Sequence, residues 1–209
     1  MRERIALLVE REALVEPLLS YYRLMREWSE RMNLIARPRF DETFLSLLEV
    51  SLFAYRSLPP GPLSVVAIGA GAGSPSPPRT LPPPAKLLRP ETALLLVEPG
   101  KRALFLEEAV HRLSLSGVHI EKSAFAPLCK ERKSLLADWA VSWGVNRKES
   151  LLKEGRKFVK IGFMFITGPN EVEKMKSLPP SFSLKTVPVP HRDALVLAFL
   201  NKVPRGTKP

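Results

Sequence analysis

Three glycines that follow an apolar run are the first residues whose type and spacing indicate chemistry. The run ends at Ile68, and Gly69, Gly71 and Gly73 come directly after it in alternation. Glycine has no Cβ atom, so the backbone at such positions can lie against a small molecule. An apolar strand that leads into this turn predicts a nucleotide-type pocket at the end of a buried strand.

The spacing of the glycines argues against a dinucleotide pyrophosphate as the ligand. The order is G-x-G-x-G and not G-x-G-x-x-G, and prolines crowd the region where the next helix would present its amides. Alternating glycines are typical of methyltransferases that use S-adenosylmethionine. Glu98 closes the next apolar run, where a carboxylate can accept hydrogen bonds from both ribose hydroxyls. We therefore predict S-adenosylmethionine as the cofactor.

The other residue types that carry chemistry predict no second site. Cys129 is the single cysteine, so an internal disulfide is excluded, and no base stands beside it in the sequence. His111 and His119 have no second ligand at metal-binding spacing, so we predict no metal site.

The composition is that of a globular protein with a strong positive charge. The chain has 209 residues, of which 45% are hydrophobic, and a formal net charge of +11. This charge favours a polyanionic partner such as a nucleic acid, with a merely basic surface as the alternative. No segment approaches the roughly 18 apolar residues of a membrane helix, and the N-terminus lacks the apolar core of a signal peptide. We expect a cytoplasmic protein that does not enter a membrane.

Residues 1–60 predict a helical cap. Apolar residues at spacings of three and four mark the face of one helix, namely Leu18, Tyr22, Met25, Trp28 and Met32. Pro17 suits the first turn of this helix, and a shorter helix is expected before it. Asp41 is the expected N-cap of a further helix, which ends at the prolines after Leu58.

Residues 61–209 predict an α/β domain, which forms one compact unit with the cap. Strands are expected at 63–68, 93–98, 118–122, 135–143, 157–166, 182–189 and 193–201, and helices within 100–117, 146–155 and 168–177. Alternation of strands and helices predicts a doubly wound parallel sheet. The last two strands follow each other closely and should be antiparallel. Residues 74–84 are rich in proline and predict an extended surface loop.

Several stretches together resemble one family over most of the chain. They are YYRLMREWSERMNLIARPRF, GAGSP…LLRPE, LVEPGKRALFLEEAVHRLSLSGV and HRDALVLAFLNK. In this order and at nearly this spacing they resemble the bacterial small-subunit ribosomal RNA guanine-N7 methyltransferases, historically called glucose-inhibited division protein B. The individual residues that match are Trp28, Asn33, Leu34, Lys101, Arg102, Phe105 and Leu106.

The resemblance implies a fold, an activity and a set of site residues. The fold is a class I, Rossmann-like methyltransferase sheet with an antiparallel last strand and an N-terminal helical cap. The activity is methylation of guanine N7 in 16S rRNA, free or in the small ribosomal subunit, by a monomer. The implied cofactor contacts are Gly69, Gly71, Gly73, Ser74, Glu98, Ala124 and Phe125. The implied RNA contacts are Lys101, Arg102, Lys160 and Trp143. No residue is predicted to be catalytic, because guanine N7 carries a lone pair and no proton.

Departures from the family pattern leave two alternatives open. The aspartate that the family has before the glycines is Ala67, and a basic residue at the fourth strand is Trp143. A protein of this fold that has lost catalysis and binds rRNA or the ribosome without methylating it is the first alternative. A methyltransferase of the same fold with another substrate is the second.

Overall fold

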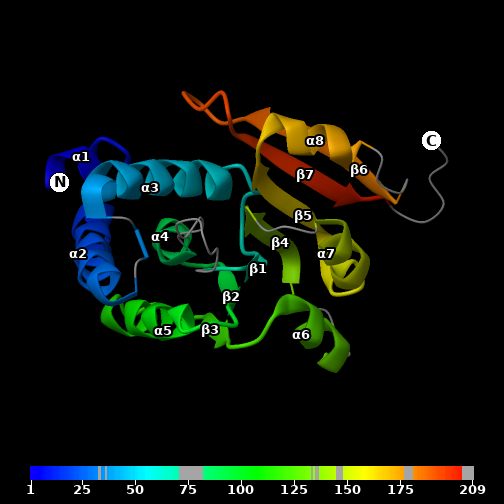
Figure 1. Cartoon of the computed structure of the whole chain (residues 1–209), viewed down its shortest axis with the longest axis horizontal. Helices are drawn as coiled ribbons and strands as arrows, with labels where there is room; N and C mark the ends of the chain where they lie inside the picture. The colour runs from blue at the N-terminus through cyan, green and yellow to red at the C-terminus, as the bar shows by residue number, and fades with distance from the viewer. Residues whose placement is uncertain are drawn as a thin grey trace.

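The centre of the protein is a seven-stranded sheet in the order β3-β2-β1-β4-β5-β7-β6 (Figure 1). The structure, a computed structural model, describes residues 1–32, 34–35, 37–70, 82–132, 134, 137–144, 148–176 and 181–203. The strands are β1 (Ser64–Ile68), β2 (Ala93–Val97), β3 (Val118–Glu121), β4 (Ala137–Trp143), β5 (Val159–Thr167), β6 (Phe182–Pro188) and β7 (Val196–Lys202).

Strand direction gives the sheet two distinct edges. Strands β1 to β5 are parallel, with Ile68 opposite both Val97 and Ser142. Strand β7 runs antiparallel to β5, with Val196 opposite Thr167, and β6 lies outside it. We name the edge formed by the ends of β1, β2, β4 and β5 the carboxyl edge, and the edge where these strands begin the amino edge. The doubly wound sheet with an antiparallel last strand is confirmed.

Helices cover both faces of the sheet (Figure 1). The helices are α1 (Arg2–Ala6), α2 (Val15–Met32), α3 (Phe40–Arg56), α4 (Pro82–Leu88), α5 (Arg102–Arg112), α6 (Phe125–Glu131), α7 (Lys148–Gly155) and α8 (Pro169–Met175), with short 3-10 turns at Glu12–Leu14 and Arg37–Arg39. Side chains of α2 to α5 share one apolar core with Val65 and Ala67, whereas α6 to α8 share another with Val66 and Ile68. Alternate residues of β1 therefore face opposite layers, as the pleat of a strand requires.

The expected N-terminal helices are confirmed, but the N-cap expected for one of them is wrong. Pro17 lies in the first turn of α2, where the backbone amides have no partner within the helix. Helix α3 begins at Phe40, so Asp41 is its second residue and not its N-cap. The carboxylate of Asp41 instead accepts a hydrogen bond from the hydroxyl of Tyr22, 2.7 Å away, and so joins α2 to α3.

The extended loop expected at residues 74–84 is wrong for the last three of them, which belong to a helix. Helix α4 begins at Pro82 and includes Pro83 and Pro84. These prolines occupy the first turn, where a missing N–H removes no hydrogen bond of the helix. Residues 71–81 lie outside the described residues, so the rest of the expected loop is not tested.

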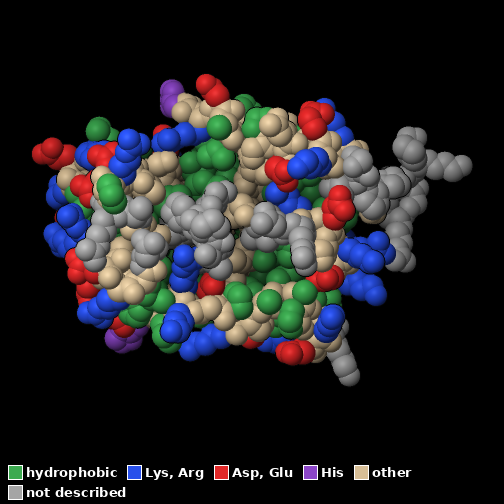
Figure 2. Space-filling model, viewed as in Figure 1, with side chains coloured by type: hydrophobic (Ala, Val, Ile, Leu, Met, Phe, Trp, Pro, Cys, Tyr) green, Lys and Arg blue, Asp and Glu red, His purple; other side chains and the backbone are tan. Residues whose placement is uncertain are grey.

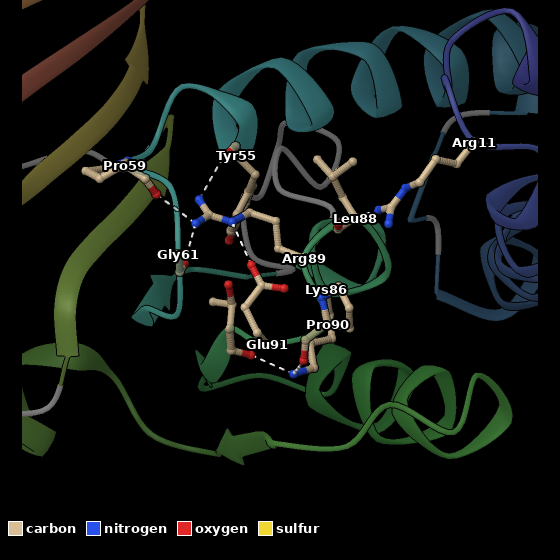
Figure 3. A network of polar contacts seen from close by, with 10 residues as sticks. Arg11, Tyr55, Pro59, Gly61, Lys86, Leu88, Arg89, Pro90 and Glu91 are labelled. Atoms are coloured by element: carbon tan, nitrogen blue, oxygen red, sulfur yellow. Dashed lines mark hydrogen bonds and ion pairs between the residues drawn. The ribbon is translucent and has the colours of Figure 1, made fainter.

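Helix α4 is tied to the cap by an arginine that follows it. The Arg89 guanidinium donates to the backbone carbonyl oxygens of Tyr55, Pro59 and Gly61, at 3.3, 2.7 and 2.7 Å (Figure 3). These carbonyls belong to the end of α3 and to the link that leads into β1. Arg89 therefore holds the cap at the amino edge of the sheet.

A buried lysine closes the turn between α4 and β2. The Lys86 ammonium donates to the carbonyl oxygens of Pro90 and Thr92, 2.5 and 2.6 Å away (Figure 3). Burial lowers the pKa of Lys86, and the nearby Glu91 carboxylate partly opposes that shift. Because Thr92 immediately precedes β2, the two hydrogen bonds hold the beginning of that strand against the end of α4.

Candidate functional site

The turn after β1 is joined directly to the end of β2. The backbone amide of Gly69 donates to the carbonyl oxygen of Val97 at 2.9 Å, and the amide of Ala70 shares the same acceptor at 3.4 Å. Gly69 has a φ of +69°, a conformation that costs a residue with a side chain free energy. The first glycine of the motif thus turns the chain at the carboxyl edge, where ligands of open α/β sheets bind.

Glu98 follows β2 and lies next to this turn. Its amide donates to the carbonyl of Glu121 at 3.0 Å, which holds the chain in line with the end of β3. Its carboxylate Oε1 accepts a hydrogen bond from the Gly100 amide, 3.2 Å away, and the residue is 1% exposed. A Cβ at Gly100 would come within 3.3 Å of that oxygen, so a side chain there would require the carboxylate to shift slightly. Sequence analysis did not single out Gly100, although its place two residues after Glu98 in a glycine-containing turn is a usable signal.

These described residues fit an adenosyl ligand. A carboxylate has about four lone-pair sites, so Glu98 can accept ribose hydroxyls besides the Gly100 amide. The turn at Gly69 bonds through its backbone amide to Val97, the residue directly before Glu98. Gly71, Gly73 and Ser74, the other expected contacts in this motif, lie outside the described residues.

The expected contacts after β3 lie at two different depths. Ala124 is the N-cap residue of α6, with extended backbone, and its carbonyl accepts the Leu128 amide. Phe125 is 3% exposed, and a Cβ at Gly155 would collide with its ring. Ala124 is exposed near the carboxyl edge, whereas the Phe125 ring fills the core on the face opposite the cap.

Both tryptophans of β4 are buried in the core. Trp143, the last residue of the strand, is 7% exposed and packs in the cap-side core, as does the fully buried Ala67. Trp139 is buried beside Phe199, with ring centroids 5.8 Å apart.

Ser142 is the one polar residue in the second half of β4. Its hydroxyl donates to the carbonyl of Ile68 at 3.3 Å and links β4 to the end of β1. Sequence reasoning did not assign this role to Ser142, although a hydroxyl inside an apolar strand is a usable signal.

The expected RNA contacts do not lie together. Lys101 is exposed and immediately precedes α5, and Arg102 is the first residue of that helix, three and four positions after Glu98. Lys160 is the second residue of β5 and so lies at the amino edge, where its ammonium is 4.0 Å from the Asp138 carboxylate. Hydrogen bonds from Ser64, first from its backbone amide, lower the pKa of Asp138 despite its partial burial, and Lys160 adds to this shift.

The surface mixes both signs of charge. Figure 2 shows Lys and Arg side chains spread around one face, with acidic side chains among them. Among the described residues, no three His, Cys, Asp or Glu side chains gather as metal ligands would. Within the same ranges, no helix has both the length and the apolarity that crossing a bilayer requires.

Comparison with solved structures supports the fold. A precorrin-6y C5,15-methyltransferase from Geobacter metallireducens is similar, with a TM-score of 0.54 and 15% sequence identity, over 76% of this chain and 88% of that one. At this level of identity the likeness concerns the fold alone. The methyltransferase fold expected from the sequence is confirmed.

Sequence relatives carry the comparison further. The protein "Ribosomal RNA small subunit methyltransferase G" of Streptococcus agalactiae is 37% identical over 109 residues, which span 48% of this chain and 41% of that protein. The protein of the same name in Streptococcus pneumoniae is 26% identical over 191 residues, which span 88% of this chain and 77% of that protein. The match to the first relative thus covers less than half of its length. The family model described as "GidB: rRNA small subunit methyltransferase G" matches residues 14–187, and the chain belongs to that family.

Proposed function

We propose that this protein methylates N7 of a guanine in 16S rRNA, with S-adenosylmethionine as the methyl donor. One observation carries the proposal: the hydrogen bond from Gly69 to Val97 holds a glycine turn beside the buried Glu98 carboxylate, at the carboxyl edge of a methyltransferase sheet. Membership of a family described as small-subunit rRNA methyltransferases supports methyl transfer as the reaction and small-subunit rRNA as the substrate.

The reaction makes modest chemical demands on the protein. S-adenosylmethionine, when bound, supplies an electrophilic methyl group attached to a sulfonium. Guanine N7 has a lone pair and no proton, so no side chain has to act as a general base. The task of Gly69, Glu98 and Ala124 is therefore to bind the donor and orient it, because in-line alignment alone lowers the barrier substantially. We propose the same role for Gly71, Gly73, Ser74 and the backbone of Phe125.

The RNA side of the site is proposed to begin at α5. Lys101 and Arg102 follow Glu98 closely, so cations at these positions can hold phosphates near the bound donor. Trp143 lies at the same edge and is proposed as a base contact, although only 7% of it is exposed. N7 lies in the deep groove of A-form RNA, so the target guanine must sit in a loop or be flipped out. Lys160 lies at the other edge and is proposed as at most a distant phosphate contact.

We also propose that the protein acts as a cytoplasmic monomer, in which residues 1–60 cap the α/β unit of residues 61–209. Side chains of α2 and α3 belong to the same apolar core as those of β1 and β4, which supports one folding unit. Sedimentation equilibrium should give the mass of one chain, and a dimer would contradict this part of the proposal.

Two measurements test the activity. Calorimetry with S-adenosylmethionine should give a dissociation constant in the micromolar range or below. Labelled donor should then transfer methyl groups to 16S rRNA or to small ribosomal subunits, and nuclease digestion should release N7-methylguanosine. Absence of methyl transfer to both substrates would contradict the proposal.

The burial of Ala67 favours one alternative, a protein that binds rRNA without methylating it. Ala67 is fully buried among apolar side chains at the position where the family has aspartate. An inactive rRNA-binding protein would show no heat with the donor, yet would bind 16S rRNA with an affinity that falls steeply as salt is added. Calorimetry with the donor therefore separates the enzyme from the binding protein, and the salt dependence of rRNA binding tests the binding protein directly.

A further inference from the structure

The turn between β6 and β7 lies at the carboxyl edge of the sheet, together with the candidate site. Val196 pairs with Thr167, so residues 189–195 must lie at the end where β5 finishes. A Cβ built on Gly168, the residue after β5, would lie 3.6 Å from the carbonyl oxygen of Ala194. Residues far apart in the sequence therefore flank the same edge.

This turn has a defined shape. The amide of Arg192 donates to the carbonyl of Val189 at 3.1 Å, and the amide of Leu195 donates to the carbonyl of Arg192 at 2.8 Å. Val189 is buried in the cap-side core, which anchors the beginning of the turn. His191 is exposed and has a φ of +56°, which is uncommon for a residue other than glycine.

One ion pair joins this turn to the cap. An Nη2 donor of Arg192 lies 3.0 Å from Oε2 of Glu49, in the middle of α3, and the two residues are 143 positions apart in the sequence. Their side chains are 36% and 33% exposed, so water screens the pair only in part. Nε of Arg192 is buried and has no hydrogen-bond partner within the described ranges. Glu49 is therefore the carboxylate that fixes the direction of the Arg192 side chain.

We propose that Glu49 and Arg192 are positioning residues for the RNA substrate, a role that rests on the proposed function. The donor site occupies the ends of β1 and β2, so the target guanine has to approach over the ends of β4 and β5, which the turn flanks. The ion pair holds residues 189–195 against α3, and this sets where the exposed His191 meets the RNA.

A second tie between cap and sheet provides a matched control. Arg89 also bonds the α3 region to the α/β unit, through the carbonyls of Tyr55, Pro59 and Gly61, but at the amino edge (Figure 3). Loss of either tie weakens the attachment of the cap. Only the tie at Arg192 borders the edge where the RNA would bind.

The test compares Glu49→Gln, Arg192→Lys and the charge-reversed pair Glu49→Arg with Arg192→Glu against Arg89→Lys. Each protein is measured for its S-adenosylmethionine dissociation constant, its KM for 16S rRNA, its kcat and its melting temperature. We expect the KM for RNA to rise about fivefold in Glu49→Gln, as loss of a partly buried ion pair implies, with the donor constant unchanged. The charge-reversed pair should recover most of that loss. Arg89→Lys should lower the melting temperature and leave the KM unchanged.

Three outcomes would overturn the inference. The first is an unchanged KM in Glu49→Gln and Arg192→Lys while their melting temperatures fall, which is the behaviour of a merely structural pair. The second is a KM that rises equally in Arg89→Lys. The third is a weaker affinity for S-adenosylmethionine in the Glu49 variant, because the ion pair would then affect the donor site as well as the RNA. A wild-type protein that transfers no methyl group to RNA overturns the proposed function as well, and this is seen before any variant is made.

Discussion

The amide of Gly69 and the carbonyl of Val97 are joined by a hydrogen bond of 2.9 Å. This contact joins the end of one strand to the end of the next, so that the glycine turn and Glu98, the residue after Val97, are held side by side. The distance between two groups that would bind different parts of one adenosyl ligand is therefore set by backbone atoms. Side-chain substitutions elsewhere, such as alanine at position 67, leave this contact in place.

The first prediction concerns the backbone conformation of Gly69. The left-handed conformation costs an alanine at this position about 1–2 kcal/mol, so the turn should shift. We expect Gly69→Ala to weaken S-adenosylmethionine binding at least tenfold in calorimetry. Gly61→Ala is the control, because Gly61 has a φ of +90°, lies at the amino edge and would place its Cβ in open space. Equal loss of binding in both variants would refute the role given to the Gly69 turn.

The second prediction concerns the charge of Glu98. Glu98→Gln keeps the size of the side chain but removes a charged acceptor, and such hydrogen bonds contribute about 1.5–3 kcal/mol. The dissociation constant for S-adenosylmethionine should therefore rise by about tenfold to a hundredfold. Glu121→Gln, at the end of the neighbouring strand β3, should bind the donor as the wild type does. Unimpaired binding by Glu98→Gln would mean that the ribose is held elsewhere.

The third prediction separates the two edges by their response to salt. Each phosphate contact contributes about 0.7–0.9 to the slope of log affinity against log salt concentration. Lys101→Ala and Arg102→Ala should each weaken 16S rRNA binding and reduce that slope by about this amount. Lys160→Ala should change both quantities less than either of the other two substitutions, because Lys160 lies at the amino edge beside Asp138. A larger loss in Lys160→Ala than in the other two would place the RNA on the opposite edge.

Local patterns in the sequence predicted most of the fold because they depend on near neighbours. Apolar runs marked all seven strands, and the glycines with Glu98 marked the pocket. Both errors in element boundaries came from residues with more than one use. Proline is excluded from a helix interior but accepted in a first turn, as at Pro82. Asp41 is a residue type that suits an N-cap, yet it lies inside α3, where its carboxylate accepts a hydrogen bond from the hydroxyl of Tyr22 in α2.

Relations across the fold could not be predicted in the same way. The contact between Glu49 and Arg192 joins residues 143 positions apart, and no spacing in the sequence indicates it. Trp143 could be placed at the end of a strand, but whether its ring faces solvent or core depends on the helices packed above it. Burial of such residues is a tertiary property, and it emerges only when the layers are assembled.

The fourth prediction concerns the close approach of β5 and β7. A Cβ on Gly162 would collide with the backbone carbonyl of Leu200 in the neighbouring strand. Because backbone cannot turn aside as a flexible side chain can, Gly162→Ala should destabilise the protein by about 1–3 kcal/mol. Urea unfolding measures the change. Gly168→Ala meets its nearest atom at an ordinary 3.6 Å, so it should lose only the few tenths of a kcal/mol by which the N-cap of α8 favours glycine over alanine. A similar loss in both variants would contradict the steric argument.

The last prediction is a pH dependence that arises between α7 and α8. Hydrogen bonds from Lys174 and then Lys148, 2.6 and 3.0 Å away, lower the pKa of Glu171 from 4.5 to about 2. A depressed carboxylate pKa stabilises the folded state above pH 4.5, and this contribution is lost as the pH falls toward 2. Glu171→Gln should therefore be less stable than the wild type to urea at pH 7, and the difference should shrink steadily below pH 4.5. Glu173→Gln, at an exposed position of the same helix, controls for the loss of one carboxylate. A stability gap that stays constant down to pH 3 would show that the two lysines do not hold Glu171 in its charged form.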